Sequence, residues 1–263
     1  MTRARTLLAS ALSAAGLLIA SGCISPDEGA PHAPIGPVSS AAATAPSAHA
    51  SSTAAAALTD DQARAALITD TDLGGPWIPT QGAATWRDGL LKAKTPAGEC
   101  QRLLDALYAD ELLGAPARAV TGLDDSDTGA QLRYQVSAQP AKAVDGVLAW
   151  LKTLPRVCAR FTATTTTGAV QDVYVNDAPL PEAGDARQGL RVTLTAVTGP
   201  KGQPLDGDPG TLSLDVAVVR VGGDAFAFTN GGMGDVPNDA TQAAVQLGVQ
   251  RLADVRRQGR AQV

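Results

Sequence analysis

Residues 211–230 read TLSLDVAVVRVGGDAFAFTN, and this stretch decides the fold class that we predict for the chain. Alternate residues of its first part are apolar, which predicts a β-strand with one face formed by Leu212, Leu214, Val216 and Val218. Gly222 and Gly223 form a turn, and a second short strand, DAFAFTN, follows them. Strands joined by so short a turn pair in an antiparallel sheet.

The segments on the N-terminal side of this pair continue the strand pattern. Residues 129–138 alternate Leu132, Tyr134 and Val136 with polar neighbours, and residues 189–198 repeat the alternation. Residues 160–167 and 169–176 flank Gly168 and predict a hairpin. A Gly, Pro and Asp-rich loop at residues 199–210 leads into the stretch quoted first.

Four other segments have helical spacing. Residues 58–68 begin with Thr59 as an N-cap and Gln62 three residues later, which is a capping box. Residues 96–114 and 140–155 are two further helices, with Gly114 as the predicted stop of the first. Asn238 caps a C-terminal helix. The predicted class is therefore α+β, an antiparallel sheet with helices packed on one face.

The N-terminus has the pattern of an export signal. Arg3 and Arg5 precede an apolar run, residues 7–20, that is shorter than the about 20 residues of a membrane span. Small residues then lead into Cys23, and the combination resembles a bacterial lipoprotein signal. The resemblance implies that residues 1–22 are removed and that Cys23 carries a lipid anchor. The alternative is an ordinary signal peptide with an incidental cysteine.

Residues 23–57 form an Ala, Ser and Pro-rich segment that we predict to be a disordered tether, because it has too few large apolar residues to form a core. Residues 58–263 are the predicted binding domain. The chain carries 21 basic and 26 acidic residues, and loss of a signal containing Arg3 and Arg5 takes its net charge from −5 to −7. This charge argues against a nucleic acid partner.

Two cysteines remain in the predicted domain, Cys100 and Cys158. In an exported chain the simplest arrangement of two remaining thiols is a disulfide. A pair of separate buried thiols is the alternative.

Several of these segments also carry a family likeness. It lies in ALITDTDLGGPW (66–77), ECQRLL (99–104), AWLKTLPRVCARF (149–161), the Gly184–Asp185 pair and VAVVRVGGDAFAF (216–228). Together they resemble the extracellular PknH-like sensor domain, which occurs on actinobacterial membrane kinases and on free-standing actinobacterial lipoproteins. The resemblance implies a twisted antiparallel sheet braced by disulfides, a ligand cleft between sheet and helices, and a binding or sensing role.

Residues that carry common catalytic chemistry are scarce. The predicted domain has no histidine, which excludes Ser-His-Asp and Cys-His nucleophile pairs and His-ligated zinc. Two acidic clusters, 124–127 and 206–208, lack the complete spacing of a calcium loop and are interpreted as turn aspartates. We therefore expect no catalytic residue, metal or cofactor.

Three residues are candidates for ligand contact. Trp77 and Trp86 lie in loop-like stretches and could line a cleft, although packing is the simpler role for both. Arg220 interrupts an apolar strand, so its side chain either points to solvent or faces a carboxylate ligand.

The hypothesis is a lipoprotein anchored at the extracytoplasmic face of the cell membrane, whose domain binds a small envelope ligand or a partner protein without catalysis. A lipid carrier, which would need a deep apolar cavity, is one alternative. A carboxylate-dependent envelope hydrolase, which would need two converging acids, is the other.

Overall fold

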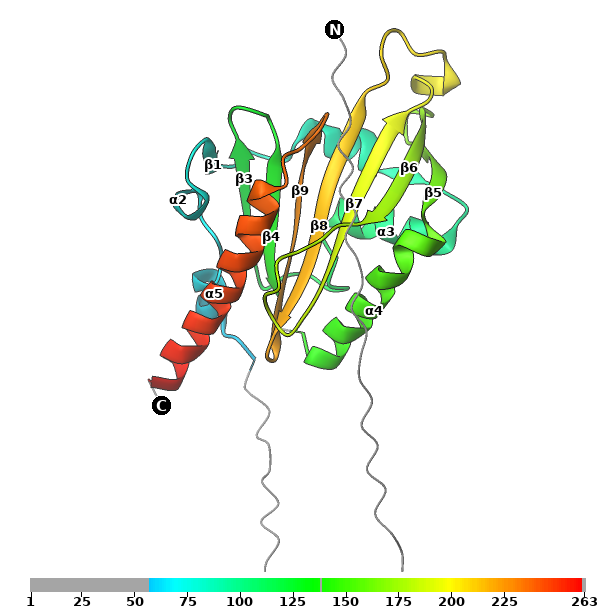
Figure 1. Ribbon diagram of the computed structural model, residues 1–263. Helices are drawn as coiled ribbons and strands as arrows, with labels where there is room; N and C mark the ends of the chain where they lie inside the picture. Colours follow the sequence, from blue (N-terminus) through cyan, green and yellow to red (C-terminus); the bar gives the residue numbers. More distant parts are fainter. Residues whose placement is uncertain (1–56, 138, 262–263) are drawn as a thin grey trace, which may run out of the picture. The chain divides into compact units, whose positions relative to one another are not determined.

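The computed structural model describes residues 57–137 and 139–261 (Figure 1). The predicted signal segment, Cys23 and the tether up to residue 56 lie outside these residues. The described chain forms a nine-stranded antiparallel sheet with helices packed against it, which confirms the α+β class. No helix in this part of the chain is both long and apolar enough to cross a membrane.

The strands lie in the order β1-β3-β4-β9-β8-β7-β6-β5-β2 across the sheet. The longer strands are β3 (Ala119–Asp125), β4 (Gln131–Ser137), β5 (Arg160–Thr165), β6 (Val170–Asp177), β7 (Ala186–Ala196), β8 (Thr211–Val221) and β9 (Asp224–Met233). Two very short strands close the edges, β1 (Trp77–Pro79) and β2 (Ala93–Lys94). The pair quoted from the sequence, β8 and β9, lies at the centre of the sheet.

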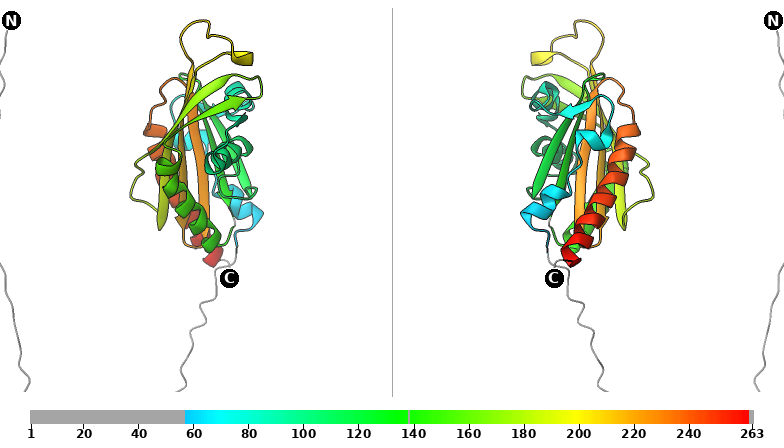
Figure 2. Two further views of the ribbon diagram at one scale, coloured as in Figure 1. Left: turned by 90° about the vertical axis from the view of Figure 1, so that its right-hand side faces the viewer. Right: turned by 90° about the vertical axis from the view of Figure 1, so that its left-hand side faces the viewer.

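Helices cover both faces of the sheet, whereas the sequence pattern predicted one. One face carries α3 (Gly98–Ala109), α4 (Ala141–Val157) and the π-helical turn η1 (Arg87–Leu91). The other carries α1 (Asp60–Ala65) and α5 (Asp239–Ala261), with the short α2 (Asp70–Leu73) against α5. Figure 2 shows α3 and α5 on opposite sides of the sheet. A short 3-10 turn, η2 (Pro200–Gly202), lies between β7 and β8.

The reason for two covered faces lies in β8, which is buried on both sides. Val216 and Val218 belong to the apolar cluster under α3 and α4. Ala217 and Val219 belong to the separate cluster under α5 and α1. Successive side chains of a strand point to opposite faces, so a strand that is apolar at both sets of positions needs a helix on each side.

Two local predictions are confirmed. Thr59 accepts the backbone N–H of Gln62, whose side chain accepts the backbone N–H of Thr59, so the capping box begins α1. Cys100 and Cys158 form a disulfide, with their Cα atoms 5.6 Å apart. This bond ties the first turn of α3 to the end of α4 on the same face of the sheet.

Candidate functional site

The structure does not bring the three predicted ligand residues together. Trp77 begins β1 and packs against the cluster under α5. Trp86 precedes η1 and packs against the cluster under α3 and α4, on the opposite face of the sheet. The Arg220 guanidinium lies 2.8 Å from Asp145 of α4 and 3.6 Å from Asp185, so two carboxylates of the chain itself already face it.

A different candidate binding site lies on β3 and β4, on the face of the sheet that carries α3 and α4 but beyond the area that these helices cover. Gly122 and Asp124 of β3 lie on one face of the sheet with Gln131 and Arg133 of β4, because the register pairs Gly122 with Arg133 and Asp124 with Gln131. We call these four residues the polar face. Val120 lies on the same side of β3 and is 46% exposed, which shows that no helix covers this part of the sheet.

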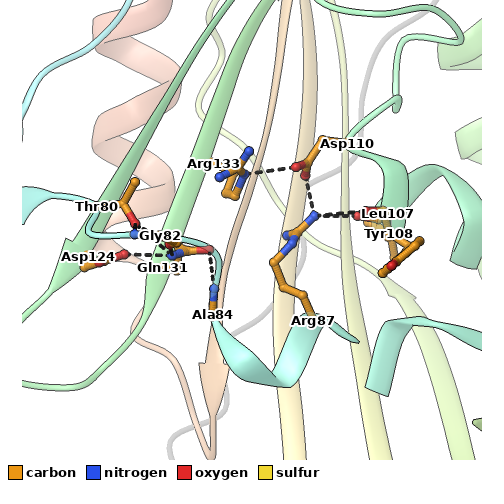
Figure 3. Close-up of polar contacts among 10 residues, drawn as sticks. All are labelled: Thr80, Gly82, Ala84, Arg87, Leu107, Tyr108, Asp110, Asp124, Gln131 and Arg133. Atoms are coloured by element: carbon orange, nitrogen blue, oxygen red, sulfur yellow. Dashed lines mark hydrogen bonds and ion pairs between the residues drawn. The ribbon is translucent and has the colours of Figure 1, made fainter. Parts of the chain in front are cut away.

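Gln131 fastens a loop onto one end of the polar face (Figure 3). Its Nε2 donates to Asp124 Oδ1 at 2.8 Å, to the Gly82 carbonyl at 2.9 Å and to Thr80 Oγ1 at 3.1 Å. Its Oε1 accepts the backbone N–H of Ala84 at 3.3 Å. The loop thereby forms one wall of an open hollow of about 400 Å³ whose floor includes Asp124 and Gln131.

Two arginines share a single aspartate at the other end of the polar face. Arg87 Nη2 lies 2.5 Å from Asp110 Oδ1, and Arg133 Nε lies 3.0 Å from Asp110 Oδ2. Figure 3 shows the two guanidinium groups approaching Asp110 from η1 and from β4. Arg87 is only 5% exposed, whereas the Arg133 side chain is 22% exposed. The two guanidinium groups and their shared carboxylate therefore lie at the border between buried and open surface.

The local conformation of the chain explains why these groups meet. Helix α3 ends at Ala109, and Asp110 takes the left-handed conformation at φ 57° as its C-cap, which aspartate tolerates better than most residues. Arg87 Nη2 also donates to the Leu107 carbonyl at 2.9 Å, in the last turn of α3. A cation at a helix C-terminus interacts favourably with the helix dipole. Arg87 opens the π-helical turn η1, and such turns are frequent at functional sites.

Three buried donors in this charge cluster make no hydrogen bond to the described residues: Arg87 Nη1, Trp86 Nε1, and Arg133 Nε, which faces Asp110 as an ion pair only. The Arg87 guanidinium carbon lies 5.8 Å from the centre of the Trp86 ring. Burial is the main cause that lowers the pKa of Arg87; the charge of Asp110 opposes it, and the positive charge of Arg133 adds to it. A buried donor without an acceptor is costly, so this locus favours a group that supplies acceptors and negative charge.

The two buried acidic residues of the described chain pair with arginines. The buried Asp215 lies 2.8 Å from Arg191 on β7, and the buried Asp224 lies 2.5 Å from Arg256 on α5. Among the residues that the structure describes, no group of three or more His, Cys, Asp or Glu side chains is placed to hold a metal ion.

The sequence interpretation missed Arg87, Asp110 and Arg133. Trp86 is the one predicted ligand residue that lies beside them. Arg133 carried a weak signal, since it is the charged member of a strand whose other polar positions are glutamine and serine. Asp110 and Arg87 carried no sequence signal, because they come together only through the tertiary packing of η1 under α3.

Comparison with known proteins gives a likeness in overall fold. No family model matches the chain, and no curated protein matches it. Among solved structures it is similar to the extracellular domain of PknH from Mycobacterium tuberculosis, with 16% identity and a TM-score of 0.43 over 76% of this chain and 98% of that chain. The finding is a weak fold-level resemblance to a sensor domain, and membership of that family stays a prediction.

Proposed function

We propose that this chain is a lipid-anchored protein of the extracytoplasmic face of the cell membrane, and that its domain binds a ligand or partner in a sensor-like role without catalysing a reaction. The polar face, with Arg87 and Asp110 behind it, is the proposed binding surface. The export-type N-terminus, the disulfide and the fold-level resemblance to a sensor domain support the extracytoplasmic location.

One observation carries the binding role. Two guanidinium groups share one carboxylate next to open surface, and buried donors of Arg87 and Trp86 have no acceptor within the described chain. The unpaired donors and the second guanidinium add no stability to the folded domain, since a buried donor without an acceptor is costly. A ligand that supplies the acceptors explains why the arrangement is present.

Binding is better supported than the two alternatives. A hydrolase would need two acids that converge on a pocket, but the buried acids described here pair with arginines. A lipid carrier would need a deep apolar cavity, whereas the hollow beside the polar face is open. The paired acids and the open hollow both favour a binding surface over a catalytic pocket or a lipid cavity.

The proposed lipid anchor predicts that the protein is found in the membrane fraction. Cys23→Ala is expected to move the protein out of the membrane fraction, because each buried lipid methylene contributes about 0.8 kcal/mol of membrane affinity that the variant lacks. Fractionation of the cell envelope followed by immunoblotting measures the distribution. Ser25→Ala, which leaves the cysteine in place, is the matched control and should stay in the membrane. Equal membrane retention of Cys23→Ala would contradict the anchor.

The proposed binding role predicts that a ligand stays bound to the protein during extraction. Mature protein extracted from its own envelope in mild detergent should show a noncovalent adduct in native mass spectrometry. We expect the adduct to be lost in Arg133→Met, because that variant removes the exposed guanidinium of the site. It should persist in Arg118→Met, whose guanidinium pairs with Asp60 at 2.6 Å outside the polar face. The absence of any adduct, or its equal presence in all three proteins, would refute the proposed binding role.

A further inference from the structure

We infer that the group bound at the polar face is a monoanionic carboxylate, held by the terminal edge of the Arg133 guanidinium. The inference rests on the proposed function, since it names the class of ligand that the same surface takes. The carboxylate can belong to a small organic acid or to the C-terminus of a short peptide, which share this chemistry.

The geometry of Arg133 leaves room for two oxygen atoms. Its contact with Asp110 is made through Nε at 3.0 Å, and no acceptor for Nη1 or Nη2 is found among the described residues. A guanidinium presents its N–H groups as a planar fork that matches the two oxygens of a carboxylate. The side chain is 22% exposed, so a ligand can reach this edge from solvent.

Gly122 lies opposite Arg133 in the strand register, and Thr80 approaches it closely. A Cβ atom at Gly122 would lie 3.6 Å from Arg133 Nη1 and only 2.6 Å from Thr80 Cγ2. Any side chain larger than glycine would therefore displace Thr80, which accepts a hydrogen bond from Gln131 in the loop that walls the hollow. A Cβ here would make only ordinary van der Waals contact with Arg133, so it is the closeness of Thr80 that requires glycine at this position.

The charges favour one negative charge over two. Arg87 and Arg133 carry two positive charges and share the single carboxylate of Asp110, while the charge of Asp88 also acts on Arg87, so a ligand with one negative charge fits better than one with two. Asp88 accepts from the Tyr108 hydroxyl at 3.0 Å, and Asp124 accepts from Gln131. A phosphate dianion would add a second negative charge on the side of the molecule that holds these acids, and like charges repel.

The surroundings favour a short apolar substituent on the carboxylate. Val120 and Ile78 lie on the same side of the sheet as Arg133 and are 46% and 44% exposed. The half-buried Trp86 lies beside Arg87, whose guanidinium carbon is 5.8 Å from the centre of its ring. Apolar groups next to a guanidinium fork fit an acid with a few carbon atoms or the last residues of a peptide.

The test follows the fluorescence of Trp86 in the full mature chain in detergent. Sodium butyrate is titrated at constant ionic strength, and Trp86→Phe identifies the part of the signal that belongs to this indole. We expect a saturable change whose Kd is weakened at least about tenfold in Arg133→Met and stays within about twofold in Arg118→Met. N-acetyl-dialanine and its C-terminal amide form a second arm: tighter binding of the free peptide acid than of butyrate assigns the peptide source, and the amide should not bind.

A stability measurement separates ligand recognition from a structural role of Arg133. Without ligand, Arg133→Met leaves Arg87 and Asp110 as a balanced pair, so its urea midpoint should be equal to or higher than that of the natural protein. A lower midpoint would assign Arg133 to the fold and overturn the inference. Phosphate binding more tightly than butyrate, or Arg133→Met binding butyrate as well as Arg118→Met does, would also overturn it.

The two proposals fail in distinguishable ways. An envelope adduct that is lost in Arg133→Met, together with no butyrate or peptide binding, would refute the carboxylate and leave the binding function in place. If neither an adduct nor carboxylate binding is found, the proposed function itself is refuted.

Discussion

Replacing Arg87 with methionine is expected to lower the free energy of unfolding by about 3 kcal/mol, because the change removes one partner of a buried ion pair. The side chain is 5% exposed, and its Nη2 contacts Asp110 and the Leu107 carbonyl together. Methionine fills a similar volume but leaves that carbonyl unpaired in the last turn of α3. Urea unfolding followed by circular dichroism measures the difference.

Arg64→Met is the matched control for this change. Arg64 forms an ion pair with Asp61 three residues earlier, and its side chain is 62% exposed. Exposed pairs of this kind contribute little, so we expect a loss of less than about 0.5 kcal/mol. If the two methionine variants unfold at the same urea concentration, Arg87 does not hold η1 under α3 as described.

Removal of the disulfide is expected to cost about 4 kcal/mol by the chain-entropy estimate for a loop of this length. Cys100 and Cys158 are separated by 58 residues, and both are buried. The Cys100→Ala and Cys158→Ala double variant tests the expectation by urea unfolding. Reduction of the natural protein with dithiothreitol should lower its urea midpoint by a similar amount.

The double variant loses the covalent link between α3 and α4. The bond ties α3 to α4, and the C-terminal cap of α3 is Asp110 of the candidate site. A destabilisation below about 1 kcal/mol would mean that residual contacts in the unfolded chain already restrict the loop between the two cysteines.

Local sequence patterns predicted much of the fold. The helix predicted over residues 96–114 has the buried face expected for α3, formed by Cys100, Leu103, Leu104 and Leu107. The strand at β4 buries Leu132, Tyr134 and Val136 as expected. These predictions succeeded because burial on one face leaves a period in the sequence.

The end of α3 shows why the candidate site was not predicted. Gly114 was expected to stop the helix, because glycine is the usual residue in the left-handed cap position. The helix instead ends four residues earlier, with Asp110 at φ 57°. That conformation, and hence the carboxylate that Arg87 and Arg133 share, depends on contacts between residues more than twenty positions apart. No local pattern encodes such a meeting.

Strands β3 and β1 were missed for a related reason. Residues 119–125 read AVTGLDD, where a glycine and two aspartates hide a strand that pairs with β4 on one side and β1 on the other. Their strand conformation comes from the hydrogen bonds of neighbours. The open polar face exists because this poorly marked strand extends the sheet beyond the helices.

The two short edge strands also determine how copies of the protein behave when many are crowded together. β1 spans three residues and ends in Pro79, which has no N–H to offer, while β2 spans two and carries Lys94. Proline, lysine and very short length are the devices by which natural sheets discourage a foreign strand from adding at an edge. A wide antiparallel sheet with such edges resists joining its neighbours into a continuous ribbon, so each copy keeps its own polar face accessible.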